Sequence, residues 1–348
     1  MHWEPIYVVS DELFSPVRLM KQIPNTFGIE VYARHFFSYR SVEELRTWVT
    51  ENPKQTPLLH IGAGSNLLFT KDYEGTVLHS EIRYIHLEEE DDTYVTLAVG
   101  AGTCWDDLVA YCVSRGWQGV ENLSLIPGEV GSAAVQNIGA YGVEIADVLC
   151  WVEGVDLWTG DVHRWSREAC AYGYRNSLFK RPDMKHYALT EVCLRLCKGG
   201  VPCLSYQGLA AELARSGLPP TLQAVRQAVI NLRRSKLPDP SHMGNAGSFF
   251  TNPVVSKARG EELRRSYPDM PTFPTADGQV KLSGGWLIEQ CGWKGRAVGD
   301  AAVYEKQALV LVNRGHATGE DIYRLSEEII QSVEAKFCVR LSREVNVI

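Results

Sequence analysis

Apolar residues recur along this chain with two spacings, one typical of helices and one typical of strands. Residues 221–234 and a long segment that begins near Thr318 repeat the helical spacing. Residues 95–99 alternate between apolar and polar or small side chains, which predicts a strand, and 151–158 and 186–196 are expected to be strands as well. The pattern therefore predicts a mixed fold of helices and strands.

Short polar signals mark where several helices begin and end. Ser41 and Glu44 have the spacing of a capping box and predict a helix over the following residues. Thr103 is expected to cap another helix, which Gly116 ends. The two prolines in 238–240 predict a stiff linker, and we place a domain boundary there.

The stretch from Ile126 to Tyr141 is both apolar and rich in glycine, and Glu129 is its single charged residue. Ordinary surface loops do not have this composition. Its glycines stand among small residues, so the backbone can approach a bound group closely and direct N–H donors at it. The stretch fits a buried phosphate or ring system, or else a series of tight turns packed under another element.

A second glycine segment follows the apolar run 58–61 and has the sequence Gly-Ala-Gly-Ser-Asn at 62–66. A strand that leads into such a loop forms a nest of backbone amides suited to anions. The segment is not a Rossmann fingerprint, because Leu67 occupies the position of the third glycine and no helical spacing follows. Two such loops in one chain favour a long ligand with a pyrophosphate in its middle.

Length and charge narrow the class of protein. The chain has 348 residues, which predicts roughly two to three domains. Its 35 basic and 42 acidic side chains leave a net charge of −7, so there is no broad electrostatic footprint for nucleic acid. We therefore expect no nucleic-acid partner, and any substrate phosphate must be met by local cations.

Cysteine usage and hydropathy indicate a cytoplasmic protein. Nine cysteines cannot all pair, and in a chain of this length they are expected to be reduced. Cys193 and Cys197 share one side of an alternating run but lack the spacing of zinc ligands, so we expect no metal site. The first residues have no basic region before an apolar run, and no segment approaches 18 apolar residues. We expect neither secretion nor membrane insertion, and no obligatory protein partner is evident.

Three polar residues are candidates for chemistry, although each also has an ordinary structural interpretation. Ser248 lies among small residues before two phenylalanines and could donate a proton in a sheltered site, or bond its own backbone in a turn. Arg175 could present its guanidinium to a carboxylate, or stack on a neighbouring tyrosine. Strand alternation in 343–348 places Glu344 opposite the valines, which predicts a solvent-facing carboxylate.

Six motifs lie between Asn25 and Pro253, within a resemblance that extends from Asn25 to Ile348. They are NTFGIE (25–30), IGAGSN (61–66), ENLSLIPGEVGSAAVQNIGAYGVE (121–144), YGYRNSLFK (172–180), KLPDP (236–240) and GNAGSFFTNP (244–253). In sequence and order these motifs resemble the UDP-N-acetylenolpyruvoylglucosamine reductases, flavoenzymes of peptidoglycan precursor synthesis. The first two dozen residues fall outside the resemblance.

The resemblance implies an α+β protein with a two-domain FAD-binding fold of the vanillyl-alcohol-oxidase/PCMH type. Residues 1–83 and 84–236 are expected to be the two parts of the FAD-binding region, with the C-terminal strand 343–348 returning to the first part. Residues 237–342 are expected to form a third, α/β, substrate-binding domain.

The resemblance also implies NADPH-dependent reduction of UDP-N-acetylglucosamine enolpyruvate to UDP-N-acetylmuramate through bound FAD. The family's catalytic positions match Arg175, Ser248 and Glu344. The nucleotide sugar is expected to contact Tyr206, Arg233, Lys236, Asn252 and Gln307, and the Tyr206 loop indicates the longer subtype of the family. FAD is expected to contact Ile61, Gly62, Gly64, Ser65, Asn66, Leu67, Pro127, Gly128, Gly131, Ser132, Gln136, Asn137, Gly139, Ala140 and Tyr141.

This chemistry explains the catalytic residue types. Arg175 is a fixed cation where negative charge grows on the substrate's carboxylate, and Ser248 would protonate the carbanion-like carbon. Glu344 beside that carboxylate is expected to share a proton or to have a raised pKa.

Two departures from the family pattern stand out, and two alternatives remain open. Asn346 stands where members often carry a basic residue near the flavin, and Asp300 follows Gly299 where a second small residue is usual. One alternative is another FAD-dependent oxidoreductase of the same fold, which would leave residues 244–253 and Glu344 unexplained. The other is an inactive nucleotide-sugar-binding protein, and the presence of all three catalytic residue types argues against it.

Overall fold

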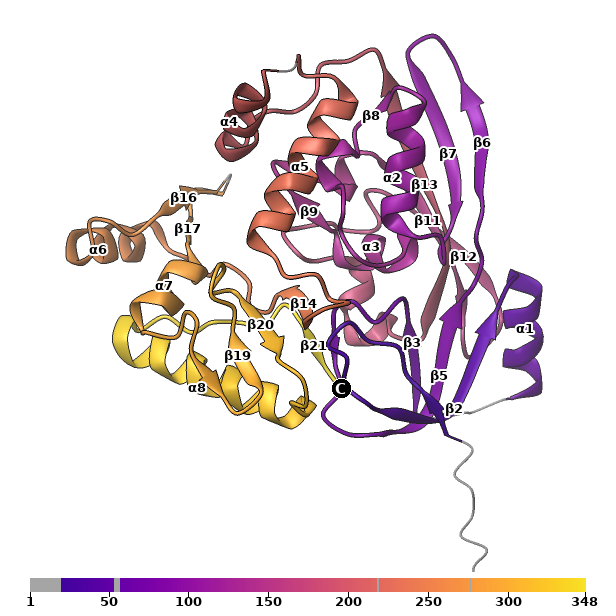
Figure 1. The fold of residues 1–348 in the computed structure, drawn as a ribbon. Helices are drawn as coiled ribbons and strands as arrows, with labels where there is room; N and C mark the ends of the chain where they lie inside the picture. The colour runs from indigo at the N-terminus through magenta and orange to yellow at the C-terminus, as the bar shows by residue number, and fades with distance from the viewer. Residues whose placement is uncertain (1–19, 53–56, 218, 276) are drawn as a thin grey trace, which may run out of the picture.

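A computed structural model describes residues 20–52, 57–217, 219–275 and 277–348 (Figure 1). The prediction that the chain has no secretion signal concerns residues 1–19, which lie outside the described residues. The described chain forms three groups of elements, each built around its own sheet or pair of sheets. None of the described helices is long and apolar enough to cross a membrane.

The first group contains a four-stranded sheet with the order β1-β2-β5-β3, in which β2, β5 and β3 run parallel and β1 pairs antiparallel. The strands are β1 (Lys21–Gln22), β2 (Tyr32–Tyr39), β3 (Leu58–Ile61) and β5 (Tyr73–Ser80). The predicted helix is α1 (Val42–Glu51), capped by Ser41, whose Oγ accepts from Glu44 N at 3.0 Å. The Glu44 carboxylate accepts a hydrogen bond from Arg40 N at 2.7 Å, whereas a complete capping box would have it accept from Ser41 N.

The second group contains an antiparallel sheet with the order β12-β11-β13-β7-β6, and β8 also pairs with β13. Its strands are β6 (Ile85–Glu90), β7 (Tyr94–Gly100), β8 (Trp117–Gln118), β11 (Leu149–Asp156), β12 (Val162–Ser166) and β13 (Tyr187–Lys198). In Figure 1 one side of this sheet is covered by α2 (Trp105–Ser114), α3 (Val130–Gln136) and α5 (Leu222–Lys236), with α4 (Gln207–Ser216) beside α5. The buried side chains of α2 and α3 pack with those of β7 and β13 in one core.

The start of α2 corrects one sequence prediction. Cys104 occupies the N-cap and makes no side-chain capping bond. Thr103, the expected cap, instead donates its hydroxyl to the Tyr84 carbonyl at 3.3 Å, because it lies one residue too early. Gly116 follows the helix with a φ of 75°, as expected of a glycine that ends a helix.

Short elements connect these layers. They are η1 (Glu121–Leu123), β9 (Gly139–Ala140), β10 (Val143–Glu144), η2 (Ile145–Asp147), η3 (Leu178–Lys180) and η4 (Pro182–Met184). The strands β9 and β10 form a small hairpin at the end of the second glycine segment.

The third group contains the sheets β14-β20-β19-β18 and β15-β17-β16. Its strands are β14 (Gly244–Ser248), β15 (Val254–Val255), β16 (Thr272–Pro274), β17 (Val280–Leu282), β18 (Ala297–Val298), β19 (Ala301–Val303) and β20 (Val310–Asn313). Its helices are α6 (Lys257–Ser266), α7 (Gly284–Gln290) and α8 (Gly319–Phe337). The predicted apolar side of α8 is buried, and Thr318 caps the helix.

The C-terminal segment joins the third group to the first. Its strand β21 (Asn346–Val347) pairs in parallel with β4 (Leu67–Leu68), which follows the first glycine loop. Phe27 and Phe69 from the first group share a core with Phe249 and Phe250 from the third. The residues that end the chain are thereby held beside the first glycine loop. The division at 83, 236 and 342 stays a prediction.

Candidate active site

The two glycine segments face each other at the junction of the first two groups. A Cβ atom placed on Gly62 would lie 3.0 Å from Ser132 Oγ, and one placed on Gly128 would lie 2.9 Å from Ser65 Oγ. Larger residues at these positions would therefore collide with the opposite loop. The tertiary structure thus brings together two segments that 59 residues separate in the sequence.

The first loop is anchored to the C-terminal segment through Asn66. Its Nδ2 donates to the Glu344 carbonyl at 3.1 Å, and its own carbonyl accepts from Asn346 N at 3.1 Å and Asn346 Nδ2 at 3.2 Å. Asn346, one of the departures from the family pattern, therefore ties the tail to this loop. The other departure, Asp300, accepts a bond from His316 N at 3.0 Å and so shapes a loop.

A largely buried hydrogen bond between two side chains supports the second segment. Glu129, just before α3, lies with its Oε1 3.0 Å from His79 Nε2, and His79 belongs to β5 in the first sheet. A Cβ atom on Gly62 would lie 3.1 Å from Glu129 Oε2. The carboxylate therefore packs directly against the first loop and links the two segments.

The remaining predicted FAD residues line or support these segments. Several pack tightly against protein: Ile61 is buried at the end of β3, Gly64 lies against the Pro24 carbonyl, Leu67 belongs to β4, Gly131 lies against Ala101, and Gly139 and Ala140 form β9. Pro127 is exposed before Gly128, and Tyr141 has a left-handed backbone with a φ of 51°. The Asn137 side chain bonds Glu144 Oε2 at 2.7 Å and the Gly173 carbonyl at 2.8 Å, and Gln136 Oε1 accepts from Lys180 Nζ at 3.1 Å.

Arg175 extends from a tight turn toward the end of the second segment. Its Nη2 donates to the Gly139 carbonyl at 2.7 Å, and its Nη1 donates to the Asn137 carbonyl at 3.4 Å. These bonds fix the plane of the guanidinium. Its φ of 52° lies in the left-handed region that side-chain-bearing residues seldom adopt.

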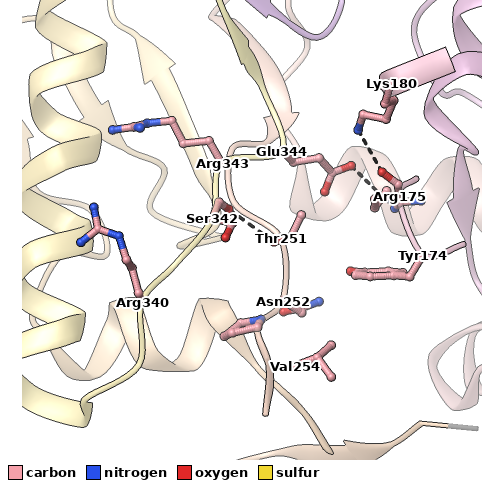
Figure 2. Close-up of a pocket in the computed structure, with 11 residues that line it drawn as sticks. Tyr174, Arg175, Lys180, Thr251, Asn252, Val254, Arg340, Ser342, Arg343 and Glu344 are labelled. Carbon is pink, nitrogen blue, oxygen red and sulfur yellow. Dashed lines mark hydrogen bonds and ion pairs between the residues drawn. The ribbon is translucent and has the colours of Figure 1, made fainter. Parts of the chain in front are cut away.

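Glu344 lies against Arg175, as Figure 2 shows, with Oε1 2.7 Å from Arg175 Nε. The Nε–H bond does not point at that oxygen, so the contact is an ion pair, and Nε has no hydrogen-bond partner in the described part of the chain. The Glu344 side chain is only 18% exposed, which corrects the solvent-facing placement that strand alternation predicts. Burial raises the pKa of this carboxyl group, and the nearby Arg175 and Lys180 charges oppose the shift.

Ser248 is placed close to Glu344 by backbone pairing. It ends β14 opposite Val310, and the next residue, Phe249, accepts a hydrogen bond at its carbonyl from Glu344 N at 2.8 Å. Ser248 itself is half-buried. Arg175 and Glu344 therefore meet, whereas Ser248 lies near Glu344 along the backbone and is not among the residues that line the pocket described below.

A pocket of about 340 Å³ opens beside the ion pair. Its lining includes the predicted residues Arg175, Asn252 and Glu344. The other residues that line it are Tyr174, Lys180, Thr251, Pro253, Val254, Arg340, Ser342 and Arg343. Sequence reasoning singled out none of these eight, although Tyr174 and Lys180 belong to the 172–180 motif that drew attention to Arg175.

The predicted substrate residues are more dispersed. Asn252 Oδ1 accepts from Gly284 N at 2.9 Å, and Gln307 Oε1 accepts from Leu309 N at 3.3 Å. Tyr206 is 41% exposed and meets Tyr141 edge to face, with 5.2 Å between ring centroids. Arg233 donates Nε to the Leu125 carbonyl at 3.1 Å, and burial lowers its pKa. Lys236 is exposed at the end of α5.

No group of three or more histidine, cysteine or acidic side chains among the described residues is arranged to hold a metal ion. All nine cysteines lie in the described ranges and are unpaired.

Comparison with known proteins decides the family. Residues 239–348 match the family model "UDP-N-acetylenolpyruvoylglucosamine reductase, C-terminal domain", and residues 33–166 match the model "FAD binding domain". A UDP-N-acetylenolpyruvoylglucosamine reductase from Bacteroides fragilis is 52% identical over 93% of this chain and 97% of its own length. The chain belongs to the UDP-N-acetylenolpyruvoylglucosamine reductase family.

Other reductases of this name extend the comparison. The protein from Porphyromonas gingivalis is 46% identical over 93% of this chain and 96% of its own length. The protein from Azoarcus sp. is 44% identical over 98% of this chain and 97% of its own length. The crystal structure of the Thermus caldophilus reductase matches the fold with a TM-score of 0.66 at 24% identity, covering 94% of this chain and 98% of the other. These matches confirm the expected family, the α+β FAD-binding fold and an FAD-dependent oxidoreductase.

Proposed function

We propose that this protein reduces UDP-N-acetylglucosamine enolpyruvate to UDP-N-acetylmuramate, with NADPH as the source of hydride, and that it does so in the cytoplasm. The observation that carries the proposal is the Arg175–Glu344 pair beside a pocket of about 340 Å³. A fixed guanidinium and a buried carboxyl group of raised pKa suit a substrate that carries a carboxylate. The nine unpaired cysteines support a reducing compartment.

The residues present fit an FAD molecule. Glycine at 62 and 128 lets the two loops approach each other closely. Backbone amides of two adjoining glycine-rich loops suit a pyrophosphate. When bound, reduced FAD supplies a hydride that no side chain can provide. Residues 61–67 and 126–142 would hold it, and the Asn66 bonds to the tail would keep the first loop in place.

Arg175 is assigned to the substrate carboxylate. Hydride addition to the vinyl terminus of an enolpyruvyl ether places negative charge on the adjacent carbon and, by conjugation, on the carboxylate. The guanidinium is held by two backbone carbonyls, so it is already oriented when this charge appears. Its Nε lies 2.7 Å from Glu344 Oε1, so this contact adds to the orientation of the guanidinium.

Glu344 and Ser248 are assigned to proton handling. Burial raises the pKa of the Glu344 carboxyl group, so a proton shared with the substrate carboxylate would reduce the repulsion between the two groups. Ser248, which is connected to Glu344 by the Phe249 backbone bond, would protonate the carbon next to the carboxylate. The nucleotide sugar would extend from this pocket along Asn252 toward Gln307, Tyr206, Arg233 and Lys236.

The test is NADPH oxidation followed at the absorbance of the reduced nicotinamide, with purified holoprotein. Addition of UDP-N-acetylglucosamine enolpyruvate should start rapid oxidation and yield a product two hydrogens heavier by mass spectrometry. UDP-N-acetylglucosamine, which lacks the enolpyruvyl group, is the matched control and should leave the rate unchanged. NADPH oxidation that is independent of the enolpyruvyl group would refute the proposal and favour another FAD-dependent oxidoreductase.

A further inference from the structure

The turn that carries Arg175 is conformationally strained. Gly173 and Asn176 exchange two backbone hydrogen bonds of 3.0 Å, which places Tyr174 and Arg175 at the tip of a two-residue turn. Arg175 has a φ of 52°, a conformation favoured by glycine and asparagine rather than by arginine. A strained residue keeps its conformation only when surrounding contacts hold it there.

Lys180 provides such a contact. Its ammonium group donates to the Arg175 carbonyl at 2.9 Å and to Gln136 Oε1 at 3.1 Å. Lys180 ends η3, and Gln136 ends α3, so the ammonium group connects the Arg175 turn to the second glycine segment. Figure 2 shows Lys180 and Glu344 both beside Arg175.

The surroundings of this ammonium group disfavour its charged form. Burial and the nearby Arg175 charge lower the pKa of Lys180, whereas Glu344 acts in the opposite direction. A half-buried lysine beside an arginine is unfavourable unless its hydrogen bonds compensate. In this chain those bonds are made to the carbonyl of Arg175 and to the side chain of Gln136 in the second glycine segment.

We propose that Lys180 is a positioning residue for the reductase reaction. It holds the left-handed turn at Arg175 and thereby directs the guanidinium toward Glu344 and the substrate carboxylate. This inference rests on the proposed function of Arg175. It differs from a direct contact between Lys180 and substrate, because a positioning residue loses its effect when the residue that it positions is removed.

A double-mutant cycle tests the proposal with the holoenzyme. Lys180→Met, Arg175→Ala and the double variant are compared for kcat and KM in substrate-dependent NADPH oxidation. Lys180→Met should lower kcat by roughly 10- to 100-fold in the parent protein, as expected when a charged hydrogen bond is lost, and by less than about twofold in the Arg175→Ala background. Lys180→Arg should recover part of the activity because it keeps a donor. Lys185→Met is the matched control, since Lys185 is exposed in the same segment and should retain full activity.

A second cycle does not depend on turnover. In the parent, Lys180→Met lets the strained turn relax, and this recovers part of the free energy lost with the Lys180 bond. Glycine adopts the left-handed conformation without strain and has nothing to recover, so the fall in Tm caused by Lys180→Met should be larger in an Arg175→Gly background than in the parent. Equal losses of kcat in both Arg175 backgrounds, or equal falls in Tm in both, would overturn the proposal. If the parent protein showed no enolpyruvyl-dependent oxidation, the proposed function would fail, while the Tm cycle would still test the role of Lys180.

Discussion

Arg175→Lys keeps the positive charge but removes the geometry that the active site provides for it. In the parent protein the guanidinium donates to the Gly139 and Asn137 carbonyls and lies 2.7 Å from Glu344 Oε1. A lysine ammonium is a single centre and cannot reproduce the planar arrangement of these donors. The variant therefore tests whether orientation, rather than charge alone, makes Arg175 effective.

The expected fall in kcat follows from the number of oriented hydrogen-bond donors that the substitution removes. Removal of one oriented donor toward a developing negative charge typically lowers kcat by about 10² to 10³, or roughly 2.7–4 kcal/mol. Because lysine retains the charge, we expect the lower end of that range, a fall in kcat of about 10² at saturating substrate. Reduction of FAD by NADPH should be nearly unchanged, since that step creates no charge on the substrate carboxylate.

Steady-state NADPH oxidation gives kcat, and stopped-flow absorbance of the flavin separates the two half-reactions. Arg181→Lys is the matched control, because Arg181 is exposed and forms a two-bond pair with Asp183 of 3.0 and 2.7 Å in the same segment. Its kcat should stay within about twofold of the parent value. A kcat for Arg175→Lys within about threefold of the parent value, which is less than 1 kcal/mol, would refute the assigned role.

Three further predictions concern the remaining parts of the site. Ser248→Ala should leave FAD reduction by NADPH nearly untouched and slow flavin reoxidation by the enolpyruvyl sugar by about 10² to 10⁴ in stopped-flow measurements; equal slowing of both steps would instead indicate a role in organising the flavin pocket. Because burial raises the pKa of Glu344, the folded state disfavours its ionised form, so Glu344→Gln should have a higher Tm than the parent at neutral pH. That gain should disappear as the pH falls below the ordinary carboxyl pKa, where both states are protonated, and a gain that persisted in acid would contradict the assigned cause. Gly128→Ala would place a Cβ atom 2.9 Å from Ser65 Oγ and force a φ of 128° on a side-chain-bearing residue, so it should weaken FAD binding measured by flavin fluorescence. Gly199→Ala, whose Cβ atom would meet no atom within 4 Å, is the control for a positive φ alone. Equal FAD affinity in the two variants would contradict the assignment of FAD to the two glycine loops.

The glycine segments illustrate how far local sequence can predict a site. Their composition indicates backbone approach to a ligand, and the strand before the first segment ends at Ile61 as the apolar run predicts. The same reasoning does not reveal that Asn137 and Gln136 use their side chains inside the protein. Those bonds run to Gly173 and Lys180, which lie in a different loop, and no local pattern reports contacts over that separation.

At Glu344 the local pattern predicts the wrong surroundings for the side chain. Alternation along 343–348 correctly separates the side of Val345 from that of Glu344, but it cannot report what covers the second side. The tail pairs with Asn66 and Phe249, and this brings the carboxyl group against Arg175. The family motifs indicated a catalytic position that periodicity alone would have missed.

By itself the sequence determined the helices α1, α5 and α8, several strands such as β7 and β13, and the two glycine-rich segments, because these depend on residues close together in the chain. The tertiary structure decided which of these segments meet. It placed β21 beside β4, Gly62 beside Ser132 and Lys180 against the Arg175 carbonyl. The balance of burial and charge that raises the Glu344 pKa exists only after these distant segments have packed together.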